Sequence, residues 1–149
     1  MLFLFNDTFI AFELQVARKI RYTERMNHSI ETIHIDSMRS PCPIANALEI
    51  VGDKWTLLII RDAFAGKKTY SEFQASPEGI PTNILADRLK RLVVFDILKK
   101  TPYQQHPIRF SYHLTEKGRS LAPLLKETMN WGLAHISQTD AKIKIDWQA

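Results

Sequence analysis

The sequence predicts a mainly α-helical domain that carries one small β-hairpin, and three observations predict it. Apolar residues recur every three or four positions through most of residues 44–94, which is the period of amphipathic helices. Two segments that follow, ILKKTPY and IRFSYHLT, alternate apolar and polar residues as half-buried strands do. The helical period then returns over residues 119–137, so the hairpin lies between helices.

Residues 1–40 are predicted to form an N-terminal extension. From Leu2 to Ile20 apolar residues recur every three or four positions, which indicates an amphipathic helix, and residues 23–40 are polar and indicate a linker. We expect this helix to cover the domain or to pair with a second subunit. The alternative is that translation starts at Met26 or Met38 and that the upstream segment is a leader. A signal peptide is not expected, because no basic residue precedes the apolar stretch.

Capping signals divide residues 44–95 into four short helices. The first ends at Gly52, and Asp53 is placed to cap a second, nearly apolar helix over residues 54–65. A third covers residues 69–75, and Ser-Pro-Glu-Gly at 76–79 predicts a tight turn. Pro81 suits the first turn of the fourth helix, whose predicted core face is Leu85, Leu89 and Leu92.

One longer helix is predicted after the hairpin. Thr115 is a good N-cap, and the helical period continues to about Ser137, leaving residues 138–149 as a C-terminal tail. The succession of elements at residues 41–137 is that of a winged helix-turn-helix domain followed by a long C-terminal helix. The apolar face of that helix is large for a peripheral position and comprises Leu121, Leu124, Leu125, Met129, Leu133 and Ile136.

The positive charge of the chain is concentrated in the fourth helix and the hairpin. Between Thr82 and Arg119 eight Lys and Arg residues stand against three acids, a net of +5, whereas the rest of the chain sums to −1 of the total +4. A basic helix that leads into a basic hairpin is the arrangement with which winged helices contact DNA. The sequence therefore predicts double-stranded DNA as a partner.

The outer face of the fourth helix supplies the predicted contacts to DNA. Thr82 and Asn83 are placed to reach base edges in the major groove, and Lys90 and Arg91 to reach phosphates. Asp87 would repel phosphate and is expected to pair with Lys90 or Arg91 on the helix surface. Arg88 is expected to be structural, with its stem on apolar surface and its head near a carboxylate.

Several separated motifs resemble one known family. The run CPIANALEIVGDKWTLLIIRDAF, the ILADRLKRL helix, the YHLTEKG junction and a late Trp131-Gly132 are similar, in the same order, to the HxlR-type winged-helix regulators, relatives of the larger MarR group. The resemblance covers roughly residues 42–136. It implies a homodimeric transcriptional regulator that binds a palindromic operator. The residues that it places at the DNA are Thr82, Asn83, Ala86, Lys90 and Arg91 in the recognition helix and Lys99 and Arg109 on the wing.

The resemblance also implies a dimer built from the first and last helices, to which Trp131 would add. Two positions depart from the family pattern. Asp96 stands in the turn after the recognition helix, where the family commonly has Gly; Asp tolerates a left-handed conformation better than most residues. Thr69 and Tyr70 stand where the family favours a basic-aromatic pair, so one phosphate contact is lost. We expect a weaker affinity for DNA and an unchanged fold.

Cys42, the single cysteine, stands where some members of the family carry a thiol that senses oxidants or electrophiles. A thiol near a helix N-terminus can be activated, because the helix dipole favours thiolate. The alternative, which the pattern favours, is a small unreactive residue in the dimer interface. A lone cysteine forms no intrachain disulfide, which fits a reducing cytoplasm.

Other classes of function find little support. The five histidines show no metal-ligand spacing, and the chain has no nucleophile motif, phosphate-binding glycine loop or dinucleotide fingerprint, so no enzyme, metal or cofactor is expected. Asp53 and Asp62 are interpreted as capping and solvated residues. No apolar run reaches the roughly eighteen residues of a membrane span.

The main alternative to a DNA-binding regulator is a winged-helix module that binds protein instead of DNA. A small-molecule effector is compatible with the sequence, which does not identify one.

Overall fold

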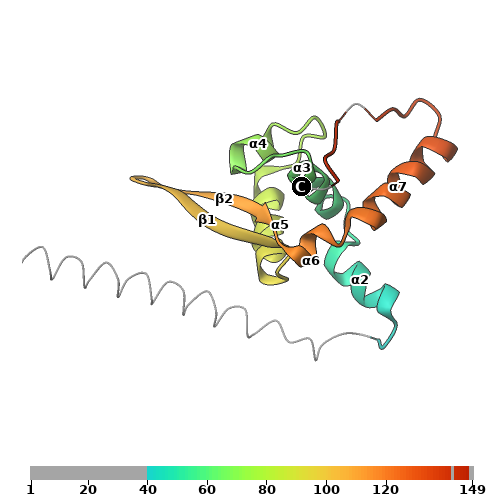
Figure 1. Ribbon diagram of the computed structural model, residues 1–149, viewed down its shortest axis with the longest axis horizontal. Coiled ribbons are helices and arrows are strands. Elements are labelled where there is room, and N and C mark those ends of the chain that lie inside the picture. The colour runs from blue at the N-terminus through green and yellow to red at the C-terminus, as the bar shows by residue number, and fades with distance from the viewer. Residues whose placement is uncertain (1–39, 142, 148–149) are drawn as a thin grey trace, which may run out of the picture. The chain divides into compact units, whose positions relative to one another are not determined.

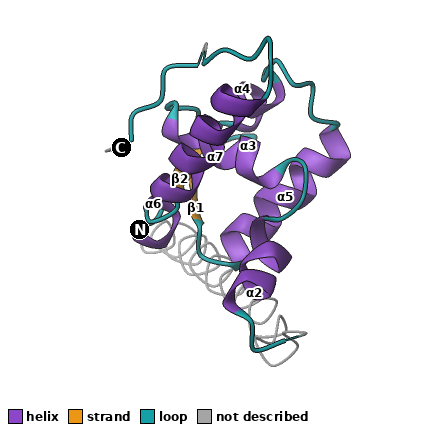
Figure 2. Cartoon of the chain, turned by 90° about the vertical axis from the view of Figure 1, so that its right-hand side faces the viewer, coloured by secondary structure: helices purple, strands orange, loops and turns teal. Residues whose placement is uncertain are grey.

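The computed structural model describes residues 40–141 and 143–147. The predicted N-terminal helix and most of its linker lie outside the described residues. The elements are α2 (Pro43–Val51), α3 (Thr56–Phe64), α4 (Tyr70–Gln74), α5 (Thr82–Val94), β1 (Leu98–Gln105), β2 (Ile108–Leu114), α6 (Glu116–Arg119) and α7 (Ala122–His135). Figures 1 and 2 show a group of helices from which one antiparallel hairpin projects. The predicted fold class is confirmed.

Helix α3 passes through the centre of the described domain. Its Ile59, Ile60 and Phe64 are fully buried, as the apolar run around them predicts. The predicted core face of α5 is also confirmed: Leu85 is 0% exposed, and Leu89 and Leu92 are each 1% exposed. Burying each such side chain contributes about 1.5 to 3 kcal/mol, so this apolar contact determines where α5 sits. No described helix is long and apolar enough to cross a membrane.

The start of α3 differs from the prediction. The helix begins at Thr56, two residues after the predicted Lys54. The N-cap is Trp55, which supplies no side-chain hydrogen bond, so the predicted N-cap at Asp53 is wrong. Asp53 lies two residues earlier, and its Oδ1 accepts the backbone N–H groups of Trp55 at 2.9 Å and Thr56 at 3.2 Å. The Thr56 hydroxyl donates to the second carboxylate oxygen. The carboxylate therefore closes the turn that leads into the helix.

Helix α4 begins with a capping box that also fixes its place beside the hairpin. The Thr69 hydroxyl accepts from the N–H of Glu72, and the Glu72 carboxylate accepts the Thr69 N–H at 2.7 Å. Hydrogen bonds from the N–H groups of Lys68 and Thr69 lower the pKa of Glu72. Thr69 also forms a β-bridge with Ser111, so α4 is tied to β2.

The turn after α5 has the backbone that the sequence predicts. Asp96 has a φ of +55°, in the left-handed region where the family commonly has Gly. The Thr115 hydroxyl donates to the Asp96 carbonyl at 2.6 Å and so joins the turn to the start of α6. The hairpin that follows turns through His106 and Pro107 alone, because the first strand runs two residues further than predicted, to Gln105, whereas the second begins at Ile108 as predicted.

The predicted single C-terminal helix is wrong: the structure has two helices, α6 and α7, separated at Ser120 and Leu121. Pro123 has no N–H for the carbonyl of Arg119, and its ring would clash with that carbonyl in a continuous helix. Instead Pro123 lies at the beginning of α7, where the missing donor costs nothing. The break lets α7 leave the hairpin in a new direction (Figure 1).

The chain after α7 returns to the domain. Residues 139–141 and 143–147, here called the C-terminal strap, end with Trp147 on the ring of Phe64, at 5.7 Å between centroids. The N–H of Asp146 donates to the Phe64 carbonyl at 3.3 Å, and Lys126 of α7 lies 5.4 Å above the Trp147 ring. The strap therefore packs against both α3 and α7.

Candidate nucleic-acid interface

The exposed stripe of α5 holds the four residues Thr82, Asn83, Ala86 and Lys90. They lie at relative positions 0, 1, 4 and 8, within about a third of the helix circumference, beside the face that carries the buried leucines. A stripe of this width presents two polar side chains at its N-terminal end and one cation two turns later. This is the part of α5 that can enter a groove.

The N-terminal end of α5 is open for an additional contact. Pro81 is the N-cap and supplies no side-chain hydrogen bond to the first turn. The first N–H groups of a helix have no acceptor within it and favour anions such as phosphate. The Tyr70 hydroxyl donates to the Thr82 carbonyl at 2.9 Å, which ties this end of α5 to α4. Sequence reasoning did not identify this role of Tyr70.

Most basic residues between Thr82 and Arg119 already have partners within the protein. Arg88 pairs with carboxylates, Arg91, Lys117 and Arg119 donate to backbone carbonyls, and Lys100 lies over the ring of Phe110 at 4.0 Å. Among the basic residues of this segment, residues 82–119, three make no ion pair, side-chain hydrogen bond or ring contact with another described residue. They are Lys90 on α5, Lys99 on β1 and Arg109 on β2, and all three are exposed.

Arg88 is structural, as predicted, but the partner predicted for Asp87 is wrong. Asp87 pairs with Arg88, its neighbour, and not with Lys90 or Arg91. The Nε of Arg88 also lies 3.0 Å from Oδ1 of Asp53, and this carboxylate contributes most to raising the pKa of Arg88. Burial would raise the pKa of Asp53, but hydrogen bonds from Thr56, Trp55 and Arg88 lower it. Arg88 therefore compensates the charge of Asp87 in the free protein.

Arg91 occupies a different environment from Lys90. Its Nη2 donates to the Glu49 carbonyl at 2.9 Å, and its guanidinium lies 6.0 Å from the Phe95 ring centroid. The side chain is half-buried between α5 and α2. A phosphate contact by Arg91 stays a prediction, and it would have to be shared with this structural contact.

The wing carries one exposed cation near its base and one near its tip. Lys99 pairs across the hairpin with His113 near the base, and both side chains are exposed. Arg109 pairs with Gln104 close to the tip. The tip also exposes two apolar side chains, Tyr103 at 52% and Ile108 at 61%, which sequence reasoning did not single out.

A buried polar cluster supports the turn that precedes α5. Asp62 is fully buried, so its interpretation as a solvated residue is wrong. Its carboxylate accepts from Lys67 Nζ at 2.9 Å, from Arg61 Nη2 at 2.7 Å and from the Ser76 hydroxyl. These donors satisfy a charge that would be costly to bury alone.

Arg61 extends the cluster to Glu78 in the same turn. Its Nη1 and Nη2 lie 2.6 and 2.9 Å from the two carboxylate oxygens. Burial would lower the pKa of Arg61, but these bonds and those to Asp62 raise it; the bond from Arg61 in turn lowers the pKa of Glu78. No local pattern could have shown this pair, because its members are 17 residues apart.

The residues predicted for the dimer interface fall into two groups. Leu125 is 7% exposed and belongs to the core of this chain, and Leu121 and Met129 are half-buried. The exposed members are Leu124, Trp131, Leu133 and Ile136 of α7 and its end, and α2 exposes two further apolar side chains, Ile44 and Leu48.

Cys42 is exposed at the N-cap of α2. Its backbone N–H donates to the Ser40 hydroxyl at 3.1 Å. Among the described residues no group of three or more His, Cys, Asp or Glu side chains is arranged to hold a metal ion.

Helix α4, the turn at 76–79, helix α5 and the hairpin together define a winged helix-turn-helix protein. The chain belongs to the HxlR-like helix-turn-helix family, whose model matches residues 50–140. The family that the sequence motifs predict is thereby confirmed.

Relatives of the chain are named as regulators. An uncharacterized HTH-type transcriptional regulator of Mycobacterium tuberculosis is 42% identical over 60% of this chain and 56% of its own length. The chain thus spans little more than half the length of these curated relatives. Among solved structures, PA1607, described as a candidate transcription factor, has a TM-score of 0.64 at 36% identity, covering 74% of this chain and 77% of its own. The redox regulator HypR, in its reduced form, has a TM-score of 0.60 at 29% identity, covering 64% of this chain and 95% of its own.

Proposed function

We propose that the protein is a transcriptional regulator that binds a palindromic site in double-stranded DNA as a homodimer. Helix α5 enters the major groove, where Thr82 and Asn83 contact base edges, and the wing follows the backbone. Membership of the HxlR-like family and the names of the relatives support this function.

The observation that carries the proposal is the position of the unpaired cations within the basic segment, residues 82–119. Here Lys90, Lys99 and Arg109 are exposed without a partner among the described residues, and they belong to the two elements that contact DNA in a winged helix. Unpaired cations are the groups that can exchange their counterions for phosphate.

The apolar surface that the described domain exposes supports a homodimer. Leu124 and Trp131 are 43% and 62% exposed, and Ile44 and Leu48 of α2 are 69% and 56% exposed. Large exposed apolar side chains are typical of protein interfaces. Two copies related by a twofold axis would place two α5 helices on half-sites about one helical turn apart.

Selection of bound fragments from genomic DNA, followed by fluorescence anisotropy on the selected duplex, tests the proposal. We expect a palindromic motif and sub-micromolar binding that weakens as salt rises. Asn83→Ala should lower the preference for the selected duplex over random DNA. Failure to select any motif, with binding to protein partners instead, would favour the interaction module.

Cys42, the single thiol of the chain, is where a response to oxidants or electrophiles would act. Its exposure leaves it accessible to both, and the solved structure of HypR is described as a redox regulator. The rate of alkylation by iodoacetamide at neutral pH distinguishes a sensor thiol from an unreactive interface residue. A sensor reacts faster than a free thiol, whereas an unreactive interface residue reacts no faster.

A further inference from the structure

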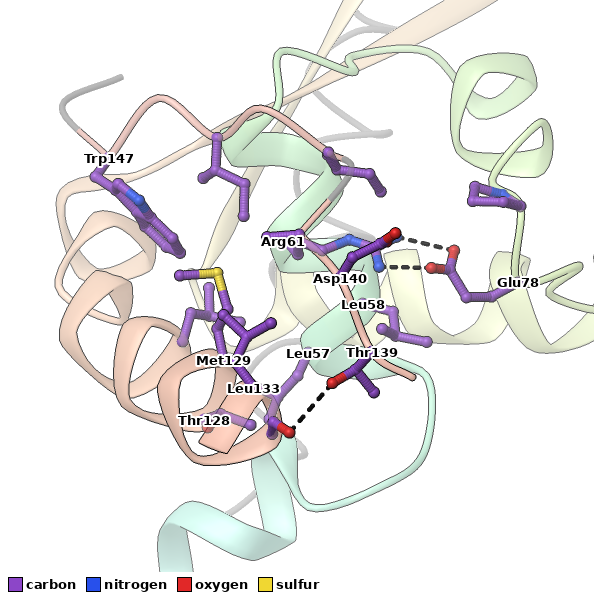
Figure 3. Close-up of a pocket in the computed structure, with 16 residues that line it drawn as sticks. Leu57, Leu58, Arg61, Glu78, Thr128, Met129, Leu133, Thr139, Asp140 and Trp147 are labelled. Carbon is purple, nitrogen blue, oxygen red and sulfur yellow. Dashed lines mark hydrogen bonds and ion pairs between the residues drawn. The ribbon is translucent and has the colours of Figure 1, made fainter. Parts of the chain in front are cut away.

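A cavity of about 440 Å³ lies between α3, α7 and the C-terminal strap (Figure 3). Leu57 and Leu58 line it from α3, Met129 from α7, and Ile145 and Trp147 from the strap. This volume lies within the range of about 300 to 1,000 Å³ that small-molecule sites occupy. The cavity shares no lining residue with the predicted DNA contacts.

The strap that forms one wall of the cavity is held at both ends. At its start the Thr139 hydroxyl donates to the Ile136 carbonyl at 2.8 Å and lies 3.3 Å from the Gly132 carbonyl. At its end Trp147 packs on Phe64. The wall formed by the strap is therefore part of the fold of the described domain.

The face of α7 that lines the cavity differs in part from the face proposed for the dimer: Leu133, which is exposed and predicted for the interface, also lines the cavity. Leu125, Met129 and Gly132 line the cavity and recur at intervals of four and three, which places them in one row. Leu124 and Trp131 are seven residues apart and lie about a quarter turn or more away on the helix. A second copy centred on Leu124 and Trp131 would therefore approach α7 from a direction other than the row that lines the cavity.

The polar groups at the rim do not favour an anion. Arg61 points its guanidinium at the cavity rim, but its positive charge is already shared between Asp62 and Glu78. The remaining charged residue of the lining, Asp140, is acidic. The Thr128 hydroxyl donates to the Leu124 carbonyl at 2.8 Å, so its proton is used as well. The described lining therefore offers no free cation to pair with an anionic ligand.

We propose that this cavity binds a small uncharged apolar molecule, and that a flat aromatic ring fits it best. The lining of this half-open cavity is mainly apolar, and an apolar molecule that binds there removes apolar surface from water, which lowers the free energy. The Met129 thioether and the Trp147 indole are side chains that pack favourably against aromatic rings. This binding does not depend on the proposed function, because it involves no DNA contact.

Two fluorescent probes with the same ring system test the ligand class. N-phenyl-1-naphthylamine is uncharged and emits strongly in apolar surroundings, and its sulfonated analogue carries one negative charge. Added to the full chain, the uncharged probe should bind with a dissociation constant in the micromolar range and the sulfonate about tenfold more weakly or worse. Equal binding of both probes, or no binding of the uncharged one, would overturn the proposal.

Gly132 offers a matched pair of variants that locates the bound probe. A Cβ built at Gly132 meets no atom within 4 Å, so a side chain can extend into the cavity without a backbone clash. Gly132→Phe should fill the space and weaken probe binding about tenfold or more, whereas Gly132→Ala should bind as the wild type does. Trp147→Ala removes a wall and should also weaken binding. Circular dichroism and sedimentation confirm that each variant is folded with an unchanged oligomeric state. The assignment is contradicted if Trp147→Ala binds the probe as tightly as the wild type and Gly132→Phe either does the same or fails to fold.

Discussion

Two parallel hydrogen bonds join Arg61 to Glu78: Nη1 lies 2.6 Å from Oε1, and Nη2 lies 2.9 Å from Oε2 (Figure 3). Arg61 belongs to the central helix α3, and Glu78 belongs to the turn that leads into α5. Bidentate pairs of this kind constrain orientation as well as distance. The pair therefore holds the approach to the recognition helix against the core.

Replacing Glu78 by Gln should lower the free energy of unfolding by about 1 kcal/mol, because a charge-assisted bidentate contact becomes a weaker neutral one. The estimate is small because both side chains keep some contact with solvent. Urea unfolding followed by circular dichroism measures it. Glu127→Gln is the control, since Glu127 is exposed and makes no ion pair with another described residue. Equal effects of the two substitutions would show that the pair contributes nothing.

The same pair predicts a specific dependence of stability on pH. The hydrogen bond from Arg61 lowers the pKa of Glu78, so folding is stabilised when this carboxylate is ionised. That stabilisation is complete above the unfolded-state pKa of about 4.3 and is lost as pH falls through the lower folded-state pKa. Unfolding free energies measured down to about pH 3 should therefore fall less steeply in Glu78→Gln than in the wild type. Parallel curves would contradict this.

Two glycines should respond in opposite directions to the same substitution. A Cβ at Gly118 would lie 2.2 Å from the Ile97 carbonyl oxygen, where α6 meets the base of the hairpin, whereas one at Gly132 meets no atom within 4 Å. Gly118→Ala should destabilise the protein by about 2 kcal/mol. Gly132→Ala should stabilise it by about 0.5 to 1 kcal/mol, because Gly is a poor residue in a helix interior. Thermal unfolding of the two variants checks both signs at once.

The exposed face of α7 predicts how the dimer can be disrupted. Trp131→Glu would place an unpaired carboxylate in the apolar contact and should raise the dimer dissociation constant about thirtyfold or more. Asn130→Glu adds the same charge one residue away on another face and should leave the constant within about threefold. Analytical ultracentrifugation over a range of concentrations measures both. A dimer unaffected by Trp131→Glu uses a different surface.

Much of this fold could be predicted because local periodicity determined it. The leucines of α5 show which face is buried, and Asp96 takes the left-handed backbone that its place in the family pattern implies. The division of the last helix could also have been foreseen, since Pro123 cannot donate to the carbonyl of Arg119. The long apolar period on both sides of it concealed the break.

The candidate site was predicted less completely, because several of its contacts join distant parts of the chain. Arg91 and Glu49 are 42 residues apart, and no charge pattern shows that the carbonyl of Glu49 accepts from Arg91. Asp62 was assigned to the surface on residue type alone, since its donors come from three separate positions. The strap is similar: Trp147 is an isolated aromatic residue in the sequence and becomes a wall of the cavity only once it reaches Phe64.

The salt dependence of DNA binding tests the central claim most directly. Lys90 is exposed without a partner among the described residues, whereas Arg91 donates to the Glu49 carbonyl. Anisotropy titrations between about 50 and 300 mM salt should show a steep fall in affinity for the wild type, and Lys90→Ala should reduce the slope by about one unit per subunit. Arg91→Ala should chiefly lower stability. A wild-type affinity that does not change with salt would contradict DNA binding through these cations. A slope that Lys90→Ala leaves unchanged would contradict a phosphate contact by Lys90 of α5.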